Sequence, residues 1–558
     1  MIATTQRQSL LFFTPLAQQI TLLKDDLLDP VDHLLDDQLL VDRVRACLLG
    51  RHPNSSRTGR PGIAPDRLLR CCVLKHMKGW SFRDLEREVR SNLLYRRFTH
   101  YDADPTPDHS VFSRTFALLA PDVTEQVLRR VVGIACEQGV AQGKQFRVDT
   151  TVIESNVHYP TDSSLLGDAM RVLTRSLSKI SKECKQGAVE VIEHSRAVKY
   201  RLLEISRAAK SKTEAGRGRM RASYQKLLGL TRSVVRQSQQ VLERFKKGRL
   251  PVVGSQLAVF AQLSQLEHFL PLAQKVIRQT KDRVVLGKEA VEKVLSLFEP
   301  HTQVIRKGKA HKPNEFGRLV RLDEAENGIV SGYEVVAGNQ SDIESWLPAL
   351  QHHQECFGKP PQMAAADRGF FSAQNEREAE TMGVKHVVLP ARGQLGEKRA
   401  QRQKERWFRR GLHFRAGCEA TVAHLKHSFS MLRAMYKGER GFQRYVGWCI
   451  ISKNLFSIAR YQEYQKRKPA AKEQAACPSQ QDRQRNGAAC KARSRAWPKS
   501  PSSARCQKPI APAAARAAIA RAEGPSTGPT CRSATAARKA RPPATMCPKR
   551  PKRSRERE

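Results

Sequence analysis

Apolar residues recur at helical spacing through the first 135 residues of the chain. They stand three and four positions apart at 34–44 and again at 68–73, which is the pattern of one apolar face on an α-helix. Turn-forming segments, GRPG at 59–62 and DADPTPD at 102–108, interrupt the pattern. We therefore expect residues 1–135 to form an all-α N-terminal domain.

Within this region the segment RLLRCCVLKHMKGWSFRDLEREV predicts two helices joined at Gly79. Ser81 is a typical N-cap residue, and the helix after it carries Arg83, Arg87 and Arg90. Two helices with a short Gly turn are typical of helix-turn-helix DNA-binding units. They also occur in other all-α domains, where such arginines are simply a solvated face, so this segment alone leaves both interpretations open.

The pattern changes at Lys144. The segment QFRVDTTVIES has β-branched and apolar residues at the density of a β-strand, and this strand presents Asp149. Long helical runs rich in Lys and Arg follow, broken by GRGR and RLPVVG. We expect residues 140–163 to hold the first strand of a sheet and 164–298 to be a helical insertion.

Strand signals resume in residues 299–460. Strands at 318–324 and 328–338 flank the turn residues Glu-Asn-Gly and predict a hairpin. Helices and strands then alternate: a helix capped near Ser341, a strand ending at Asp367, a helix through 376–382, a strand at 385–390 and a helix at about 414–435. With the insertion removed, the order is three strands followed by helix, strand, helix, strand and helix. This α/β order resembles the RNase H-like fold, a mixed sheet flanked by helices.

The charge of the chain points to a polyanionic partner. The 558 residues carry 98 Lys and Arg against 54 Asp and Glu, a formal net charge of +44, which favours DNA or RNA. Neither a run of about 18 apolar residues nor a signal peptide is seen, so we expect a soluble cytoplasmic protein without membrane contact. The 13 cysteines include no C-x-x-C pair, which favours reduced thiols over zinc ligands or disulfides.

Residues 465–558 differ in composition from the rest. They are rich in Ala, Pro and Ser and carry 24 Lys and Arg against 5 Asp and Glu. Such a segment cannot bury enough apolar surface to fold, so we expect a disordered basic tail that could bind DNA by counterion release. Its five cysteines are unusual in that setting, and a shifted or read-through reading frame explains them equally well.

Three carboxylates are candidates for metal-assisted phosphodiester chemistry, which needs acidic side chains that hold two ions about 3.5–4 Å apart. Asp149 lies amid β-branched residues, where a charge is costly unless it is paired or liganded. Asp367 follows an apolar strand, at the end where sites collect in α/β sheets. Glu419 shares one helix face with Arg415 and Lys426. On that helix alone, an ordinary Arg–Glu ion pair is the simpler interpretation.

Taken together, these segments resemble insertion-sequence DDE transposases. The stretch Arg415-x3-Glu419-x6-Lys426 resembles the Arg–Glu–Lys part of their signature, and RVDTTVIES and AAADRGFF resemble the segments with the two aspartates. GRPGIAPDRLLR, GWSFRDLE and PTPDHSVFSR resemble their helical N-terminal part. The likeness covers roughly residues 20–460 and is nearest to ISNCY-type elements. It departs at Leu412, where the family often has Tyr.

The resemblance implies a two-metal enzyme that cuts DNA at the ends of its element and joins the freed 3′-hydroxyl to target DNA. Asp149, Asp367 and Glu419 would bind Mg²⁺, with Mn²⁺ as an alternative, because all three offer hard oxygen ligands. Arg415 and Lys426 would neutralise phosphates. Double-stranded DNA would be the partner of a homodimer in the bacterial cytoplasm, associated with the nucleoid.

Several points stay open in the sequence. The loop lysines Lys309 and Lys312 are secondary candidates for DNA contact, although loop charges are often only solvated. The histidines form no metal-spaced cluster with the carboxylates, and we expect no role for them. Two alternative functions remain: a decayed transposase that only binds DNA, and an RNase H-like nuclease without strand transfer.

Overall fold

The computed structural model describes residues 23–51, 54, 58, 62–288, 293–306, 313–336, 338, 340–391 and 393–476, with side chains through 467. By its internal contacts the chain divides into residues 1–476 and 477–558. All of the second unit lies outside the described residues, and so does the rest of the predicted tail beyond the last helix. Lys309 and Lys312 lie outside them as well.

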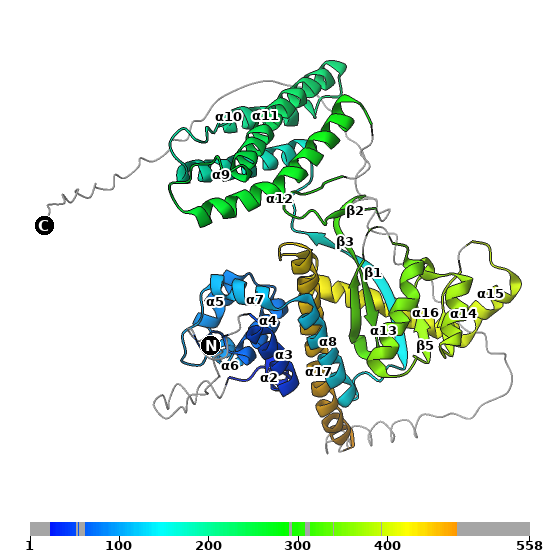
Figure 1. Cartoon of the computed structure of the whole chain (residues 1–558). Helices are drawn as coiled ribbons and strands as arrows, with labels where there is room; N and C mark the ends of the chain where they lie inside the picture. The colour runs from blue at the N-terminus through cyan, green and yellow to red at the C-terminus, as the bar shows by residue number, and fades with distance from the viewer. Residues whose placement is uncertain are drawn as a thin grey trace, which may run out of the picture. The chain divides into compact units, whose positions relative to one another are not determined.

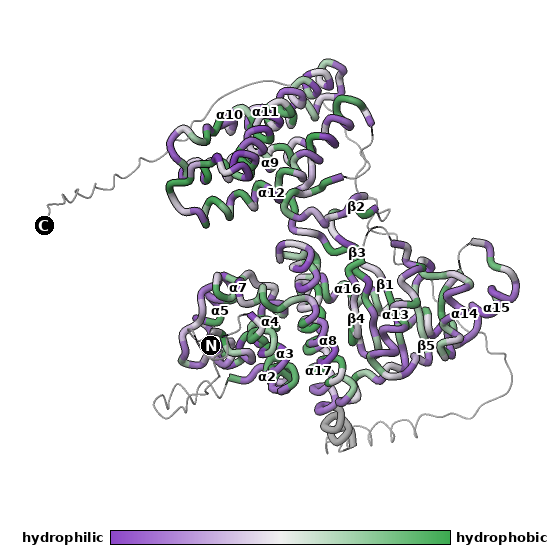
Figure 2. Tube along the Cα trace, in the orientation of Figure 1, coloured by the Kyte–Doolittle hydropathy of each residue, from purple (hydrophilic) through white to green (hydrophobic). Residues whose placement is uncertain are grey.

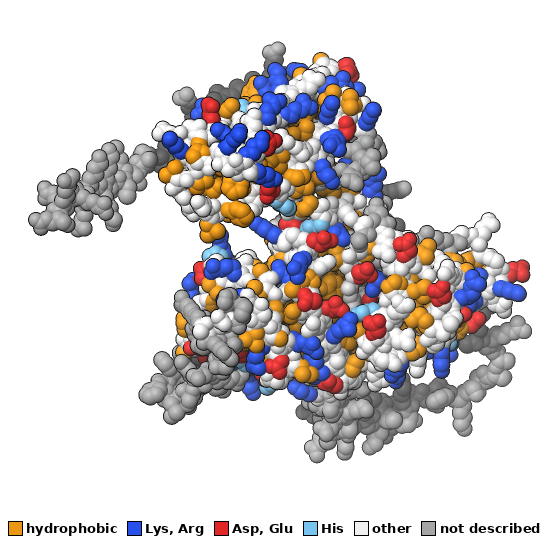
Figure 3. Space-filling model, in the orientation of Figure 1, with side chains coloured by type: hydrophobic (Ala, Val, Ile, Leu, Met, Phe, Trp, Pro, Cys, Tyr) orange, Lys and Arg blue, Asp and Glu red, His pale blue; other side chains and the backbone are white. Residues whose placement is uncertain are grey.

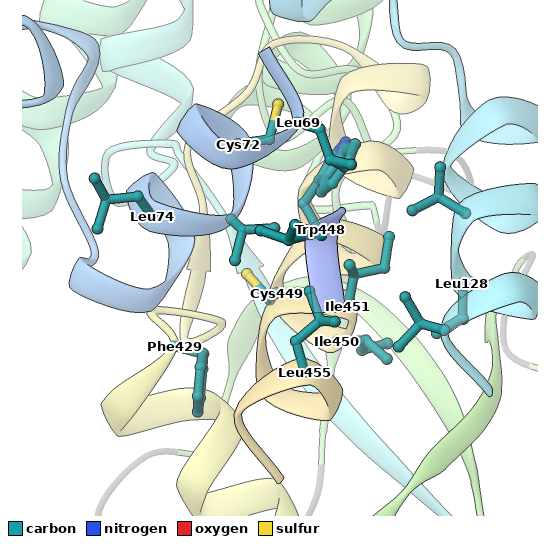
Figure 4. Close-up of a cluster of buried hydrophobic side chains, with 14 of the residues drawn as sticks. Leu69, Cys72, Leu74, Leu128, Phe429, Trp448, Cys449, Ile450, Ile451 and Leu455 are labelled. Atoms are coloured by element: carbon teal, nitrogen blue, oxygen red, sulfur yellow. The ribbon is translucent and has the colours of Figure 1, made fainter. Parts of the chain in front are cut away.

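The N-terminal part is helical, as the periodicity predicts. Its helices are α2 (Leu28–Leu35), α3 (Gln38–Leu49), α4 (Pro65–Lys78), α5 (Phe82–Ser91), α6 (Leu93–Phe98), α7 (His109–Leu118) and α8 (Pro121–Glu137). Their apolar faces share one core with the C-terminal helix α17 (Glu439–Ala476). In Figure 4, Leu69 of α4 and Leu128 of α8 lie on either side of α17 residues such as Trp448.

The turn between α4 and α5 has the local structure that its sequence predicts. Gly79 ends α4 in the left-handed conformation, with φ of 68°, which Gly adopts without a steric penalty. Ser81 caps α5, and Asp84 returns a hydrogen bond to the Ser81 backbone to complete a capping box. Leu85 and Val89 are buried beneath α5, so its arginines are left on the outer surface.

A buried histidine ties three acidic segments of this helical part together. His100 Nε2 lies 3.3 Å from the Asp32 carboxylate, and its Nδ1 lies 3.5 Å from that of Asp66. Burial alone would lower the pKa of His100, but its hydrogen bonds to Asp32 and Asp66 outweigh burial and raise that pKa above the usual value. A raised folded-state pKa means that protonation stabilises the fold.

We expect His100→Asn to lower the free energy of unfolding by about 1.5–3 kcal/mol at pH 6, because charge-assisted hydrogen bonds are lost. Asn suits the positive φ of 58° at this position. The loss should be complete below the unfolded pKa of about 6.5 and shrink as pH rises through the folded pKa. Denaturant midpoints of both proteins at pH 6 and pH 8.5 test this, and an equal loss at both values would contradict it.

A seven-stranded mixed sheet forms the centre of the remaining chain (Figure 1). Its strands are β1 (Gln145–Ser155), β2 (Gln303–Ile305), β3 (Glu315–Glu324), β4 (Val330–Val335), β5 (Met363–Ala365), β6 (His386–Val388) and β7 (Arg433–Ala434). The main path runs β2-β3-β1-β5-β6, with β4 paired to β3 and β7 paired to β1. β3 is antiparallel to β1 and to β4, which confirms the predicted hairpin, and β5 is parallel to both β1 and β6.

Alternation along β1 and β5 separates two faces of the sheet. Phe146 and Val148 pack with Ala364 and with residues of α13 (Asp342–Phe357) and α14 (Ala373–Thr381). Met363 and Ala365 point the other way, into a small core with α16 (Arg406–Ser428). The short helix α15 (Glu397–Lys404) precedes α16. Helices therefore cover both faces, and this mixed α/β arrangement fits an RNase H-like fold.

The insertion is a helical unit with its own core. It consists of α9 (Asp162–Glu183), α10 (Ser195–Ala208), α11 (Glu214–Lys246), α12 (Gln256–Thr280) and a π-helical turn, η2 (Lys281–Val285). Hydrophilic and hydrophobic residues alternate along these helices in Figure 2, as expected for amphipathic helices in a bundle. The predicted end at 298 was too late, because regular helix stops at η2 and residues 293–300 are irregular.

Three further predictions need correction. The helix expected at about 414–435 is α16, which begins and ends earlier, and Gly411 in its interior packs where Val388 leaves no space for a side chain. The short strand β2 was not predicted. Neither was α17, whose middle is apolar on nearly all sides because it lies between the N-terminal helices and the sheet. It continues to Ala476, past the expected start of the tail.

None of the helices in the described ranges is long and apolar enough to cross a bilayer.

Candidate active site

Asp149 and Asp367 lie on neighbouring parallel strands. Arg147 of β1 pairs with Ala365 of β5, and the same register continued by two residues places Asp149 beside Asp367. The backbone of Asp367 is still extended, with φ of −79° and ψ of 179°. Neighbouring strands are about 4.8 Å apart and side chains alternate between the faces. Both aspartates therefore leave the sheet on the face covered by α16.

Local hydrogen bonds orient both side chains. Asp149 Oδ1 accepts a hydrogen bond of 2.8 Å from the backbone N–H of Thr150. Asp367 caps the 3₁₀ turn η4 (Arg368–Phe370), and its Oδ1 accepts a bond of 2.6 Å from the Gly369 N–H. Both aspartates are half-buried. Each carboxylate thus has one oxygen held by the backbone at the carboxyl end of a strand.

Glu419 lies on α16 beside Arg415, as its spacing predicts. Arg415 Nη2 is 3.2 Å from Glu419 Oε1, and the Glu419 side chain is 72% exposed. Lys426 lies two turns further along and is half-buried. The predicted face of Arg415, Glu419 and Lys426 therefore exists, and its carboxylate is directed to solvent.

The buried side of α16 brings this helix against Asp149. Cys418, next to Glu419, is fully buried, and burial raises the pKa of its thiol well above the usual value, aided by the charges of Glu324 and Asp149. Gly417 packs so closely on the Arg147 guanidinium that a side chain would not fit. The segment of α16 that carries Glu419 therefore crosses over the part of β1 that carries Asp149.

The three candidate carboxylates are not drawn into one tight cluster. In the described ranges, the groups of three possible ligands with all donor atoms within 4.8 Å are Asp32, Asp36 and His100, and Glu86, Asp108 and His109. Their own contacts account for both: Arg70 bonds Asp32 and Asp36, and Glu86 caps α7 through the His109 N–H.

A fourth carboxylate, which the sequence analysis did not predict, lies beside the two aspartates. Asp342 is the first residue of α13, and its Oδ1 accepts a hydrogen bond of 3.1 Å from Thr150 Oγ1. A Cβ added to Gly369 would lie 2.8 Å from Asp342 Oδ2 and also 2.8 Å from Asp367 Oδ1. The available signal was its place after the N-cap Ser341, which we used only to position the helix.

A buried ionic cluster lies under the site. Glu324 at the end of β3 is fully buried, and it pairs with Arg147 and accepts a hydrogen bond of 2.6 Å from Thr421 of α16. Lys453 of α17 is buried nearby. Burial, opposed by the charge of Glu324 and reinforced by that of Arg147, lowers the pKa of Lys453 to about 8. Arg147 also donates to the Phe414 carbonyl, so the cluster joins β1, β3, α16 and α17.

The donor set suits a hard divalent cation. Asp149, Asp367 and Glu419 offer only carboxylate oxygens, which Mg²⁺ and Mn²⁺ prefer. The absence of a side chain at Gly369 leaves space between the carboxylates of Asp342 and Asp367. The residues present therefore fit a divalent metal.

Comparison with protein families agrees with this geometry. Residues 16–118 match the family described as Transposase domain (DUF772), and residues 300–455 match the Transposase DDE domain. The chain belongs to the insertion-sequence DDE transposases. Asp367 and Glu419 lie within the matched DDE segment of this transposase, whereas Asp149 and the helical insertion lie outside both matches. No curated protein and no solved structure matches the transposase.

The departure at position 412 has a structural consequence in this transposase. Leu412 packs against the small core of Met363, Ala365, Val388 and Phe408 beneath α16. The nearest aromatic residue in the chain, Phe414, lies 4.7 Å from the Arg147 guanidinium carbon. Both side chains therefore serve the packing of α16 on the sheet.

Proposed function

We propose that this transposase binds the ends of its insertion sequence and catalyses metal-dependent cleavage and strand transfer of DNA. Asp149, Asp367 and Glu419 are its catalytic and metal-binding residues. The observation that carries this proposal is the register of β1 and β5, which sets two aspartates 218 residues apart in sequence side by side. Their position under the helix with Glu419 supports it.

When bound, Mg²⁺ or Mn²⁺ would activate the attacking oxygen and stabilise the leaving oxygen of the phosphodiester. The chain's own residues orient that chemistry. Backbone N–H groups fix one oxygen of each aspartate, which leaves the other oxygen for a metal. Arg415 is suited to bidentate phosphate contact and would exchange Glu419 for a phosphate as DNA enters, and Lys426 extends the same cationic face.

The N-terminal helices, residues 1–135, are the proposed DNA-binding domain, with α4 and α5 as the helix-turn-helix. Arg83 is exposed, and no ion pair is recorded for it within the described residues. Arg87, in contrast, lies 3.1 Å from both Asp84 and Glu88. We propose Arg83 as the principal contact and Arg87 as an auxiliary one. The insertion (164–298) separates residues 140–163 from 299–460 of the catalytic core, and the basic tail adds sequence-independent affinity.

We expect Arg83→Ala to weaken binding to the element's ends and to lower the slope of log affinity against log salt by about one, because one phosphate contact is lost. Arg90→Ala is the matched control. Arg90 lies on the same helix but is held 3.3 Å from Glu86, so its loss should change the slope less. Fluorescence anisotropy across a salt series measures both, and equal slopes for Arg83→Ala and the unmodified protein would contradict the assignment.

The decisive experiment uses the purified chain with Mg²⁺ and DNA that carries the ends of the element. Nicking at those ends, followed by joining to a second DNA, supports the transposase proposal. Hydrolysis without joining would favour the nuclease alternative, and binding without cleavage would favour a decayed copy. Inverted repeats beside the coding region would further separate transposase from nuclease. An ISNCY-type element and action as a homodimer in the bacterial cytoplasm, at the nucleoid, complete the proposal.

A further inference from the structure

We propose that Asp342 is a fourth metal-binding carboxylate of this site, which would share a divalent cation with Asp367. The inference rests on the proposed function, since it assigns one more residue to the same site. It comes from the contacts of Asp342, Thr150 and Gly369 at the carboxyl ends of β1 and β5.

The start of α13 holds Asp342 in place from two sides. The Ser341 side chain accepts a hydrogen bond from Ile343 N and fixes the first turn of the helix. Thr150 Oγ1 then donates to Asp342 Oδ1 at 3.1 Å. With Oδ1 oriented by Thr150, Oδ2 is directed toward Gly369. The carboxylate is therefore positioned before any ligand arrives.

Gly369 shows how closely the two carboxylates approach each other. Asp342 Oδ2 and Asp367 Oδ1 both lie 2.8 Å from the point that a Cβ of residue 369 would occupy. Any side chain there would displace one of them. Two like charges around one small space repel each other, and a cation between them removes that repulsion.

Arg368 supplies a second possible cation, since it is adjacent to Asp367 in the chain and exposed. An ion pair with Arg368 would make Asp342 a structural residue, whereas a shared divalent ion would make it a metal ligand. The two roles differ in one measurable quantity, the affinity of the protein for Mn²⁺ in the absence of DNA.

The test is calorimetric titration of Mn²⁺ into the full chain without DNA, for the unmodified protein and Asp342→Asn. Asn keeps an oxygen to accept from Thr150 and removes only the charge. We expect Mn²⁺ to bind about tenfold more weakly or worse, as is typical when a supporting group of a metal site is lost. The thermal stabilisation of the protein by Mn²⁺ should fall in parallel. Glu344→Gln, on the exposed side of the same helical turn, should change neither.

Two further variants keep the outcome unambiguous. Thr150→Val removes the hydrogen bond but keeps Asp342, so a loss of Mn²⁺ affinity equal to that of Asp342→Asn would show an indirect role and overturn the inference. Unchanged affinity in Asp342→Asn, with Asp367→Asn strongly impaired, would also overturn it while leaving the proposed function intact. If Asp367→Asn binds Mn²⁺ normally as well, the proposed metal site itself fails.

Discussion

Replacing Asp367 by Asn is expected to abolish Mg²⁺-dependent nicking at the element's ends while leaving DNA binding unchanged. The carboxylate lies beside Asp149 through the register of β1 and β5, and a metal ion contributes several kcal/mol to a phosphoryl-transfer transition state. Each 1.4 kcal/mol is tenfold in rate, so a loss of roughly 10³-fold or more is expected. Single-turnover cleavage of end-labelled DNA measures the rate, and a gel-shift titration measures binding.

The substitution is designed to separate chemistry from folding. Asn keeps an oxygen that can accept the Gly369 N–H bond, so the turn after β5 should keep its structure. Glu397→Gln, an exposed carboxylate at the start of α15, is the control for loss of one negative charge and should cleave normally. Cleavage by Asp367→Asn at the unmodified rate would refute the assignment of Asp367 as a metal ligand.

The sequence predicts which elements carry Asp149 and Asp367 because each residue is marked by its neighbours. Asp149 lies among β-branched residues, and Asp367 ends an apolar run that forms β5. Their adjacency depends on the pairing of two strands separated by the whole insertion, and local patterns carry no register. The structure provides that register, and so explains how a gap of 218 residues closes.

Other residues carried no recognisable signal. Asp342 was hidden because an acidic residue after a Ser N-cap is ordinary in a helical first turn. Lys453 lies in the apolar run CIISKNLFSIA, where the sequence does not reveal its partner. Its environment depends on Glu324, on Thr421 of α16 and on Arg147 of β1. Such long-range polar contacts arise only once the sheet and α17 are assembled. The space-filling view in Figure 3 likewise shows Lys and Arg concentrated over α10 and α11, a surface that the sequence shows only as composition.

The second large effect is expected at this buried cluster. Glu324→Ala should lower the free energy of unfolding by about 3–5 kcal/mol, because it leaves Arg147 and Lys453 buried without their counter-charge. Denaturant unfolding at pH 7 measures the loss. Glu324→Gln, which can still accept from Thr421 and Arg147, should lose less, and Glu324→Ala combined with Lys453→Met should recover part of the stability. Loss of less than about 1 kcal/mol in Glu324→Ala would show that the cluster contributes little.

The pH dependence gives this prediction a sharper form. In the native protein Lys453 has a pKa of about 8, below the value of about 10.4 in an unfolded chain, so stability from this group rises with pH between these values. Without the Glu324 charge, the native pKa of Lys453 falls further, and its proton is released at lower pH. The cost of Glu324→Ala should therefore be smaller at pH 9 than at pH 7. A cost that is equal at both values would show that the loss arises from packing and not from the unpaired Lys453 charge.

The same variant connects stability to catalysis. Thr421 and the Phe414 carbonyl attach α16 to the cluster on both sides of Glu419 along the helix. Losing Glu324 should loosen this attachment, and Glu419 should then hold its position over Asp149 less often. At a temperature where Glu324→Ala remains folded, we expect slower cleavage with unchanged binding to the element's ends. Cleavage at the unmodified rate under those conditions would show that the cluster stabilises the fold without positioning Glu419.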